Sequence, residues 1–151
     1  MTYVVNDKVF LIASAGGHKY ELLNITKNFV FKDKIFLTFK SYDSNNQSEL
    51  YLVHPKRQLH RIIFNFFQSF YYLLKLRPKI IISTGADVAL FTLILGKFFF
   101  RTNNIFIESF CTNSYSITGK ISYYFSDLFI VHHREQLKFY PNAIITNGGI
   151  L

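Results

Sequence analysis

The chain has 151 residues, enough for one domain with a proper hydrophobic core. Hydrophobic residues make up 50% of it and aromatic residues 19%, which excludes a disordered chain and exceeds what a small soluble domain needs. The net charge of +8 indicates anionic partners, of which nucleic acid is the least favoured, because no RNA-recognition motif, zinc-finger spacing or Lys/Arg-rich run is present.

The cysteine count and the hydropathy pattern exclude further classes. A single cysteine, Cys111, excludes an internal disulfide bond and a multi-cysteine zinc site, and fits a reducing compartment. The N-terminus does not read as a signal peptide, because the apolar run 9–13 is short and Asp7 stands beside it. No segment reaches the roughly 20 apolar residues that a membrane-spanning helix needs.

The first elements in the chain are a strand, a small-residue turn and a helix. Residues 9–13 form an unbroken apolar run, typical of a strand buried on both faces. Ser14, Gly16 and Gly17 follow in the turn, and helical spacing begins behind His18. A glycine turn lets the backbone approach a ligand, and free N–H groups at a helix start suit a phosphate. A plain corner without a ligand is the alternative, since neither a GxGxxG fingerprint nor a P-loop is present.

The next residues complete a βαβ unit. A helix over 18–29 would cross from the first strand to a second strand over 35–39, and such units are right-handed in nearly all cases. The polar stretch 41–48 predicts a loop, and 50–53 predicts a short third strand.

The range 61–76 is predicted to be a strongly amphipathic helix, with polar residues on one face and apolar residues on another. Basic residues bracket it, and no acid occurs between Glu49 and Asp87. It either packs on the sheet with a solvated basic rim, or it faces an anionic membrane with its aromatic rings at headgroup level. The membrane interpretation places these residues at the lipid surface: Arg61, Phe64, Phe67, Tyr71 and Lys75.

A second strand–turn–helix unit follows. Residues 79–82 predict a strand, and Thr84 and Gly85 lie in a small-residue turn at its end. The nearly apolar range 88–100 predicts a helix with Asp87 as its cap. This helix is either fully buried or a second element that faces a membrane.

The rest of the chain continues the alternation of strands and helices. Residues 104–107 predict a strand with Glu108 at its end. The pattern indicates a Rossmann-like α/β fold, a mostly parallel sheet with helices on both faces. Because ligands bind beyond the carboxyl ends of such strands, His18, Thr84, Gly85 and Glu108 should gather at one edge. The remaining predicted elements are a polar loop at 109–116, a helix at 117–125, and strands at 127–131 and 143–145.

Five short motifs resemble those of a known family in their order and spacing. They resemble the bacterial capsule and exopolysaccharide proteins of the PssD/CpsF type. Those proteins are similar to the membrane-anchoring subunit of the eukaryotic transferase that adds the second N-acetylglucosamine to dolichol pyrophosphate, and to the N-terminal half of MurG-like GT-B transferases. The resemblance covers essentially the whole chain. The motifs are Ser14-Ala-Gly-Gly-His-Lys-Tyr-Glu-Leu-Leu23, Ser83-Thr-Gly-Ala86, Ile107-Glu-Ser-Phe-Cys111, Ile117-Thr-Gly-Lys120 and Tyr140-Pro141.

The resemblance implies one half of a split GT-B glycosyltransferase. Residues 1–151 would form a single Rossmann-like domain that binds the acceptor and associates with the membrane. A separate small catalytic subunit would bind the UDP-sugar donor and would be needed for hexosyl, N-acetylhexosaminyl or uronosyl transfer. The acceptor would be a polyprenyl-pyrophosphate-linked sugar of capsule or exopolysaccharide biosynthesis. The implied location is peripheral, on the anionic cytoplasmic face of the cell membrane, with no cofactor and no nucleic acid.

Inverting transfer needs a base near the acceptor hydroxyl, and the resemblance gives this chemistry to the glycine-turn histidine and the strand-end glutamate. These are His18 and Glu108. Which of them is the base stays open, and phosphate binding is the alternative role of His18. Without the resemblance, His18 reads as a capping or core histidine and Glu108 as the partner of a nearby cation. The implied acceptor-phosphate contacts are Ser14, Gly16, Gly17, Thr84, Gly85 and Lys120.

Two other functions stay open on the sequence. One is a non-catalytic membrane scaffold that recruits and activates a separate glycosyltransferase. The other is a stand-alone Rossmann-like nucleotide-binding protein. The chain has no Asp-x-Asp pair, so no metal-held nucleotide sugar is expected. It departs from the family where Lys19 and Tyr20 replace Leu-Thr, and where the stretch 112–116 lacks the cations that are often found there.

Overall fold

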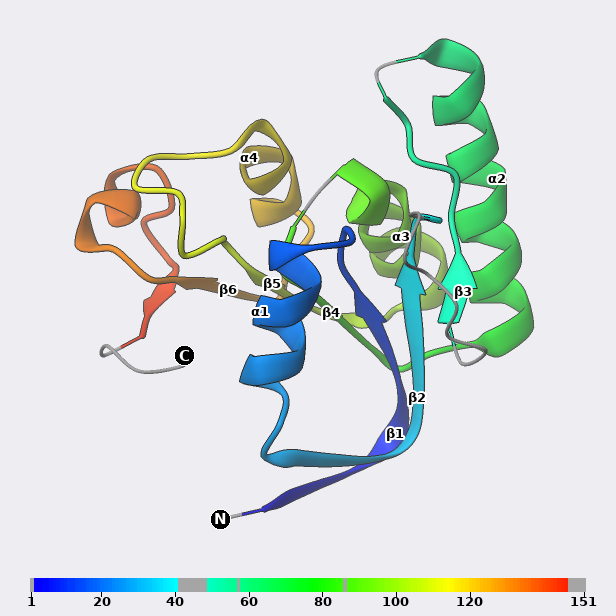
Figure 1. The fold of residues 1–151 in the computed structure, drawn as a ribbon, viewed down its shortest axis with the longest axis horizontal. Helices are drawn as coiled ribbons and strands as arrows, with labels where there is room; N and C mark the ends of the chain where they lie inside the picture. Colours follow the sequence, from blue (N-terminus) through cyan, green and yellow to red (C-terminus); the bar gives the residue numbers. More distant parts are fainter. Residues whose placement is uncertain (1, 41–48, 57, 86, 147–151) are drawn as a thin grey trace.

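The structure is a computed structural model that describes residues 2–40, 49–56, 58–85 and 87–146 (Figure 1). Within these residues, seven parallel strands form one sheet in the order β3-β2-β1-β4-β5-β6-β7. This confirms the Rossmann-like α/β class predicted from the sequence. The loop predicted at 41–48 and the terminal residues 147–151 lie outside the described residues, as do positions 57 and 86.

Strands and helices alternate along the chain. The strands are β1 (Tyr3–Ile12), β2 (Phe29–Thr38), β3 (Glu49–Tyr51), β4 (Ile80–Ser83), β5 (Asn103–Ile107), β6 (Leu128–Val131) and β7 (Ile144–Ile145). The α-helices are α1 (Gly17–Ile25), α2 (Leu59–Leu76), α3 (Leu90–Leu95) and α4 (Ile117–Tyr123). Three short helical segments are η1 (Asp87–Ala89), η2 (Gly96–Phe100) and η3 (Arg134–Lys138).

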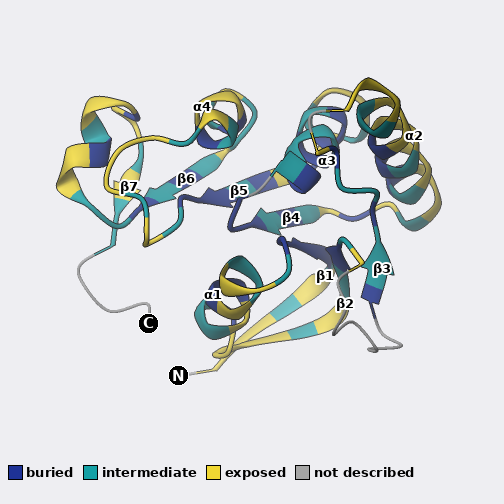
Figure 2. Ribbon diagram, turned by 45° about the horizontal axis from the view of Figure 1, so that its top comes forward, coloured by how far each residue is buried: buried dark blue, intermediate teal, exposed yellow. Residues whose placement is uncertain are grey.

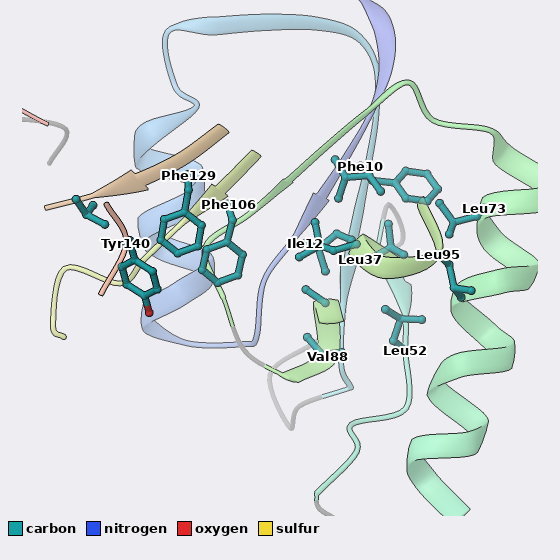
Figure 3. Close-up of a cluster of buried hydrophobic side chains, with 14 residues drawn as sticks. Phe10, Ile12, Leu37, Leu52, Leu73, Val88, Leu95, Phe106, Phe129 and Tyr140 are labelled. Carbon is teal, nitrogen blue, oxygen red and sulfur yellow. The ribbon is translucent and has the colours of Figure 1, made fainter. Parts of the chain in front are cut away.

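The carboxyl half of β1 lies at the centre of two hydrophobic layers. Val9 and Leu11 belong to a small cluster with Leu22 of α1. Phe10 and Ile12 point to the other face and join the main core, which reaches α2, α3 and the end of the sheet near Tyr140 (Figure 3). Successive side chains of a strand point to opposite faces, so an unbroken apolar run is what a strand covered on both faces requires.

The helices divide between the two faces of the sheet. Figure 2 shows α1 on one face and α2, α3 and α4 on the other. The strand order reverses direction between β1 and β4, and in doubly wound sheets the ligand crevice lies outside the carboxyl ends of the strands at that point. The glycine turn after β1 and the turn after β4 both lie there.

The first two strands are longer than the sequence predicted. β1 begins at Tyr3 and not at residue 9, and β2 begins at Phe29 and not at residue 35, so α1 ends at Ile25. The added halves pair with each other, from Tyr3 beside Phe29 onwards, and their side chains are mostly exposed (Figure 2). A pair of strands outside the core needs no apolar run, and an ion pair between Lys8 and Asp33 at 3.2 Å joins them.

The helix predicted at 88–100 is divided into η1, α3 and η2, and η2 is a π-helical turn. The predicted cap is wrong, because Ala89 precedes α3 and no side chain caps it; the Asp87 carboxylate instead lies 3.7 Å from His54 Nε2. Gly96 permits close packing, since a Cβ there would lie 2.4 Å from Thr102 Oγ1.

No helix of the described chain has the length and apolar character needed to cross a membrane.

Candidate functional site

Three of the predicted site residues meet where β1 and β4 end. His18 is the second residue of α1, directly after the glycine turn. The Thr84 hydroxyl donates a hydrogen bond of 2.8 Å to the main-chain carbonyl of His18. Gly85 packs against the imidazole, because an added Cβ would lie 3.7 Å from His18 Cε1. The structure therefore brings the two small-residue turns into direct contact through His18.

The glycine turn is open on its outer side. Gly16 has φ 88°, a conformation that side-chain-bearing residues rarely adopt, and a Cβ at Gly16 or Gly17 would meet nothing within 4 Å. Ser14 is buried at the base of the turn. The Nδ1 atom of His18 is buried and has no hydrogen-bond partner among the described residues. Buried polar atoms are nearly always paired, so an unpaired imidazole nitrogen beside free helix N–H groups is typical of a ligand site.

Glu108 is held by hydroxyl groups from elements that follow it in the chain. It is 3% exposed, and its carboxylate accepts hydrogen bonds from Tyr140 Oη at 2.7 Å and from Ser116 Oγ at 3.0 Å. Burial and the adjacent Glu108 carboxylate raise the pKa of Tyr140, so this phenol stays a donor at neutral pH. The expected alternative, a Lys or Arg partner, is not found among the described residues. The geometry suits a fixed carboxylate that accepts hydrogen bonds from three donors, the longest from the Ser109 N–H at 3.4 Å.

The start of α4 is built around this carboxylate. Ser116 caps the helix by accepting a hydrogen bond of 2.8 Å from the Gly119 N–H. A Cβ at Gly119 would lie 2.0 Å from Glu108 Oε2 and 2.6 Å from Tyr140 Oη. The Ile117-Thr-Gly-Lys120 motif therefore has a packing reason, because only glycine lets α4 approach Glu108 this closely.

The sequence reasoning missed a buried pair at the same edge, Glu21 and His132. Glu21 Oε1 lies 3.4 Å from His132 Nε2 and accepts a hydrogen bond of 3.0 Å from the Phe110 N–H. Burial would raise the pKa of Glu21, but His132 and the Phe110 N–H outweigh it and hold the pKa below its usual value. Glu21 lies one helical turn after His18, and His132 follows β6. The strand-end rule that selected Glu108 would also have selected His132.

Lys120 is in a different environment from the glycine turn. Its Nζ lies 3.5 Å above the centre of the Tyr115 ring and 6.0 Å from that of Phe139. A cation on two aromatic faces is a stable arrangement on its own. The described contacts of Lys120 therefore connect it to these aromatic rings and not to the glycine turn.

Four of the five residues predicted to face a membrane are exposed on α2: Phe64, Phe67, Tyr71 and Lys75. The fifth, Arg61, is partly buried and lines a cavity beside the ends of β2 and β3. Phe64 is 63% exposed, Phe67 62% and Tyr71 53%. The side of α2 that faces the protein is polar at its centre, where Asn65 and Ser69 are fully buried. The aromatic face of α2, defined here as the exposed side chains Ile63, Phe64, Phe67, Phe70, Tyr71 and Leu74, therefore points away from the core.

Two cavities flank the N-terminal half of α2. One has a volume of about 640 Å³ and is lined by apolar side chains of α2, α3 and α4, with Asp87 and Thr118 as polar members. The other has a volume of about 320 Å³ and is lined largely by basic and aromatic residues. Within the described ranges, no group of three or more His, Cys, Asp or Glu side chains is placed to hold a metal ion.

These features define a Rossmann-like domain with its candidate site at the carboxyl edge of a parallel sheet. Solved structures share this fold. MurG of Acinetobacter baumannii superposes with a TM-score of 0.73 at 12% identity, over 94% of this chain and 46% of that one. UDP-N-acetylglucosamine 2-epimerase of Rickettsia bellii gives 0.74 at 12% identity, over 97% and 46%. The UDP-GlcNAc 2-epimerase of Methanocaldococcus jannaschii gives 0.62 at 13% identity, over 83% and 39%.

The chain belongs to the family described as "Oligosaccharide biosynthesis protein Alg14 like", whose sequence profile matches residues 55–150. No curated protein sequence matches it significantly. The chain spans less than half the length of each of these three solved structures.

Proposed function

We propose that this chain is the acceptor-binding, membrane-associating subunit of a split GT-B glycosyltransferase, of the PssD/CpsF type within its family. Residues 1–151 serve as one domain that binds a polyprenyl-pyrophosphate-linked sugar at the cytoplasmic face of the cell membrane. A small partner subunit supplies the UDP-sugar, and the product enters capsule or exopolysaccharide biosynthesis. Membership of the Alg14-like family supports this, together with the fold shared with MurG.

The observation that carries the proposal is the buried, unpaired Nδ1 of His18, the residue that directly follows the open glycine turn. The Gly16 and Gly17 backbone has room for a pyrophosphate, and the N-terminus of α1 favours negative charge there. The imidazole, which packs against Gly85 of the neighbouring turn, would take the proton from the acceptor hydroxyl. Glu108 is the second candidate base, and it would need to exchange a hydroxyl partner for the acceptor.

A non-catalytic scaffold is the second candidate function, and the environment of Glu108 favours it. A carboxylate that already accepts hydrogen bonds from Tyr140 and Ser116 is fully explained by structure. In this alternative the chain would only anchor and activate its partner at the membrane. The aromatic face of α2 would serve both candidate functions, because this chain must lie at the bilayer whether it is a catalytic subunit or a scaffold.

A reconstituted transfer assay separates the two. The chain, its partner and a polyprenyl-pyrophosphate-linked sugar are mixed with labelled UDP-sugars, and each protein is also tested separately. Transfer is expected only with both proteins. His18→Ala is expected to reduce it about 100-fold or more, the usual contribution of a positioned base. The Glu108→Gln variant keeps the shape and the acceptor oxygen that Tyr140 needs while removing the charge.

Removal of the exposed His60 by His60→Ala is the matched control and should leave transfer unchanged. Full activity of the partner without this chain would contradict the catalytic assignment, as would full activity of the complex after both His18→Ala and Glu108→Gln. Either result would leave the scaffold as the function.

The membrane surface is tested separately from transfer. Binding to sedimenting vesicles should fall when Phe64, Phe67 and Tyr71 are replaced by serine, because three exposed aromatic rings no longer enter the interface. Replacement of Tyr20, which is 72% exposed on α1 at the opposite face of the sheet, is the control. Equal losses for both variants would show that α2 is not the membrane face.

A further inference from the structure

A basic cavity lies beside the N-terminal half of α2, where β2 and β3 end. Its volume of about 320 Å³ accommodates a small anionic group. Lys40 follows β2, His54 and Lys56 follow β3, and Arg61 comes from the first turns of α2. Four basic side chains from three segments of the chain therefore converge on one hollow, which the sequence order did not reveal.

Lys40, Lys56 and Arg61 have no carboxylate partner among the described residues, whereas the fourth basic side chain, His54, lies 3.7 Å from the Asp87 carboxylate. None of the nine residues that line it is acidic. Lys8, Lys19 and Lys97 each pair with a carboxylate, whereas no described carboxylate lies within ion-pair distance of Lys40, Lys56 or Arg61. The Nε of Arg61 is buried and has no hydrogen-bond partner among the described residues. A buried guanidinium donor without an acceptor is costly unless a ligand supplies one.

One wall of the cavity, the segment after β3, is fixed by hydrogen bonds to α2 and within itself. Gln68 of α2 accepts a hydrogen bond of 2.7 Å from the Val53 N–H, and Asn65 donates one of 2.8 Å to the Val53 carbonyl. The Lys56 N–H donates to His54 Nδ1 at 3.1 Å, and Lys56 adopts a left-handed backbone with φ 45°. Ligand binding would therefore not need to order this segment first.

The chemistry of the cavity selects a phosphoryl group. A guanidinium donates two parallel hydrogen bonds to phosphate oxygens, and lysines add charge without demanding a fixed geometry. The cavity also lies close to the aromatic face, because Arg61 is one helical turn before Phe64, which is 63% exposed. When a helix lies in the membrane–water interface with its aromatic rings at the boundary of the acyl chains, basic side chains beside those rings lie at the depth of the lipid phosphates.

We propose that this cavity binds the phosphodiester headgroup of an anionic membrane lipid, with Lys40, Lys56 and Arg61 as its donors. The inference rests on the membrane association in the proposed function and not on sugar transfer. It assigns Arg61 to a built site, beyond a general attraction of the basic surface to anionic lipid.

Vesicle binding by purified variants of the full chain tests the site. Vesicles of phosphatidylcholine alone are compared with vesicles that also contain phosphatidylglycerol. The Lys56→Gln/Arg61→Gln variant should bind the phosphatidylglycerol vesicles about 30-fold more weakly, with binding to phosphatidylcholine unchanged. The matched control is Lys32→Gln/Arg134→Gln, which removes the same charges from exposed positions elsewhere and should cost about threefold or less. The single variant Lys40→Gln, at an exposed residue, keeps the test valid if the double variant unfolds.

A soluble arm identifies the source of the phosphate. Inorganic pyrophosphate is titrated into each protein without vesicles, at matched ionic strength. Weak pyrophosphate binding together with selective loss on phosphatidylglycerol vesicles supports the lipid site. Equal losses for the cavity and control variants, or cavity-dependent binding of pyrophosphate alone, would overturn it. None of these readouts uses transfer, so an inactive complex with selective lipid binding would refute the proposed reaction and leave this site intact.

Discussion

Glu21 connects three segments that the chain order keeps apart. Its carboxylate lies on α1, accepts the N–H of Phe110 from the segment after β5, and contacts His132 after β6. His18 lies one turn earlier on the same helix and also lowers the pKa of Glu21. Glu21 therefore positions the histidine helix against the loops at the carboxyl edge, without any contact to substrate being required of it.

Replacement of Glu21 by glutamine tests this role through stability. Because the pKa of Glu21 is lowered in the folded state, its contribution is present above the usual value of 4.5 and is lost as the pH falls through the folded value. At neutral pH, Glu21→Gln should lower the free energy of unfolding by about 1–3 kcal/mol. Urea unfolding at several pH values should show a smaller loss on acidification than in the wild type.

The exposed Glu135 provides the control for this charge change, and Glu135→Gln should alter stability little. Some acid sensitivity should persist in Glu21→Gln, because Lys97 and the Asn104 N–H also lower the pKa of Asp127 against its partial burial. If the free energy of unfolding of Glu21→Gln fell with pH as steeply as that of the wild type, Glu21 would not contribute to the pH dependence of stability.

Gly119 makes a second residue-scale prediction. An added methyl group would collide with the Glu108 carboxylate and the Tyr140 hydroxyl, neither of which has free space to move. Gly119→Ala should therefore cost about 1–3 kcal/mol of stability in urea unfolding. Gly17→Ala is the matched control, since it is also a helical glycine but has nothing within 4 Å, and its effect should stay within about 1 kcal/mol. Equal stability of the two variants would refute the packing of α4 on Glu108.

At the scale of elements, α2 has its polar side inside and its aromatic side outside. Asn65 bonds the Val53 carbonyl at 2.8 Å, and Ser69 Oγ accepts from Thr92 Oγ1 of α3 at 3.0 Å. These three side chains are fully buried. The helix is therefore joined to the protein by hydrogen bonds as well as by Leu73, and its large apolar side chains remain available for another surface.

Because of this arrangement, replacing a polar residue of α2 should destabilise the fold more than replacing a large aromatic residue of the same helix. Asn65→Ala should lower the free energy of unfolding by about 1–3 kcal/mol, because the partly buried Val53 carbonyl loses its donor. Phe67→Ser, at a residue 62% exposed, should stay within about 0.5 kcal/mol. Chemical unfolding without lipid measures both, with Leu73→Ala as a buried apolar reference. A greater loss for Phe67→Ser than for Asn65→Ala would mean that the aromatic face packs against the protein.

The sequence predicted where α2 lies and that its faces differ, but periodicity carries no information on which face points inward. That depends on Thr92 and Val53, which meet the helix only after folding. The apolar run 9–13 predicted the buried part of β1, because a strand that is buried on both faces has an unbroken run of apolar residues. The exposed halves of β1 and β2 have no such apolar run, so the sequence did not reveal them. The Glu21–His132 contact was also not predictable, because it depends on the order of the strands in the sheet.

On the scale of the whole molecule, charge and apolar surface act together. The net charge is +8, with basic residues such as Arg61 and Lys75 near the two ends of the aromatic face. Like charges keep copies of the chain apart, whereas exposed aromatic rings favour their association. An anionic bilayer would satisfy both properties at once, because it attracts the charge and accepts the rings.

The opposite salt dependence of these two interactions gives a test on the intact chain. In lipid-free solution, added salt should increase self-association in sedimentation experiments, because screening weakens the repulsion between like-charged copies. The same salt should weaken binding to phosphatidylglycerol vesicles, because the attraction is screened as well. Replacing Phe64, Phe67 and Tyr71 by serine should abolish the self-association, whereas Tyr124→Ser, at a residue 81% exposed after α4, should not. A chain that stays monomeric at all salt concentrations would show that its aromatic face does not drive association in water, and its contact with lipid would then depend on charge.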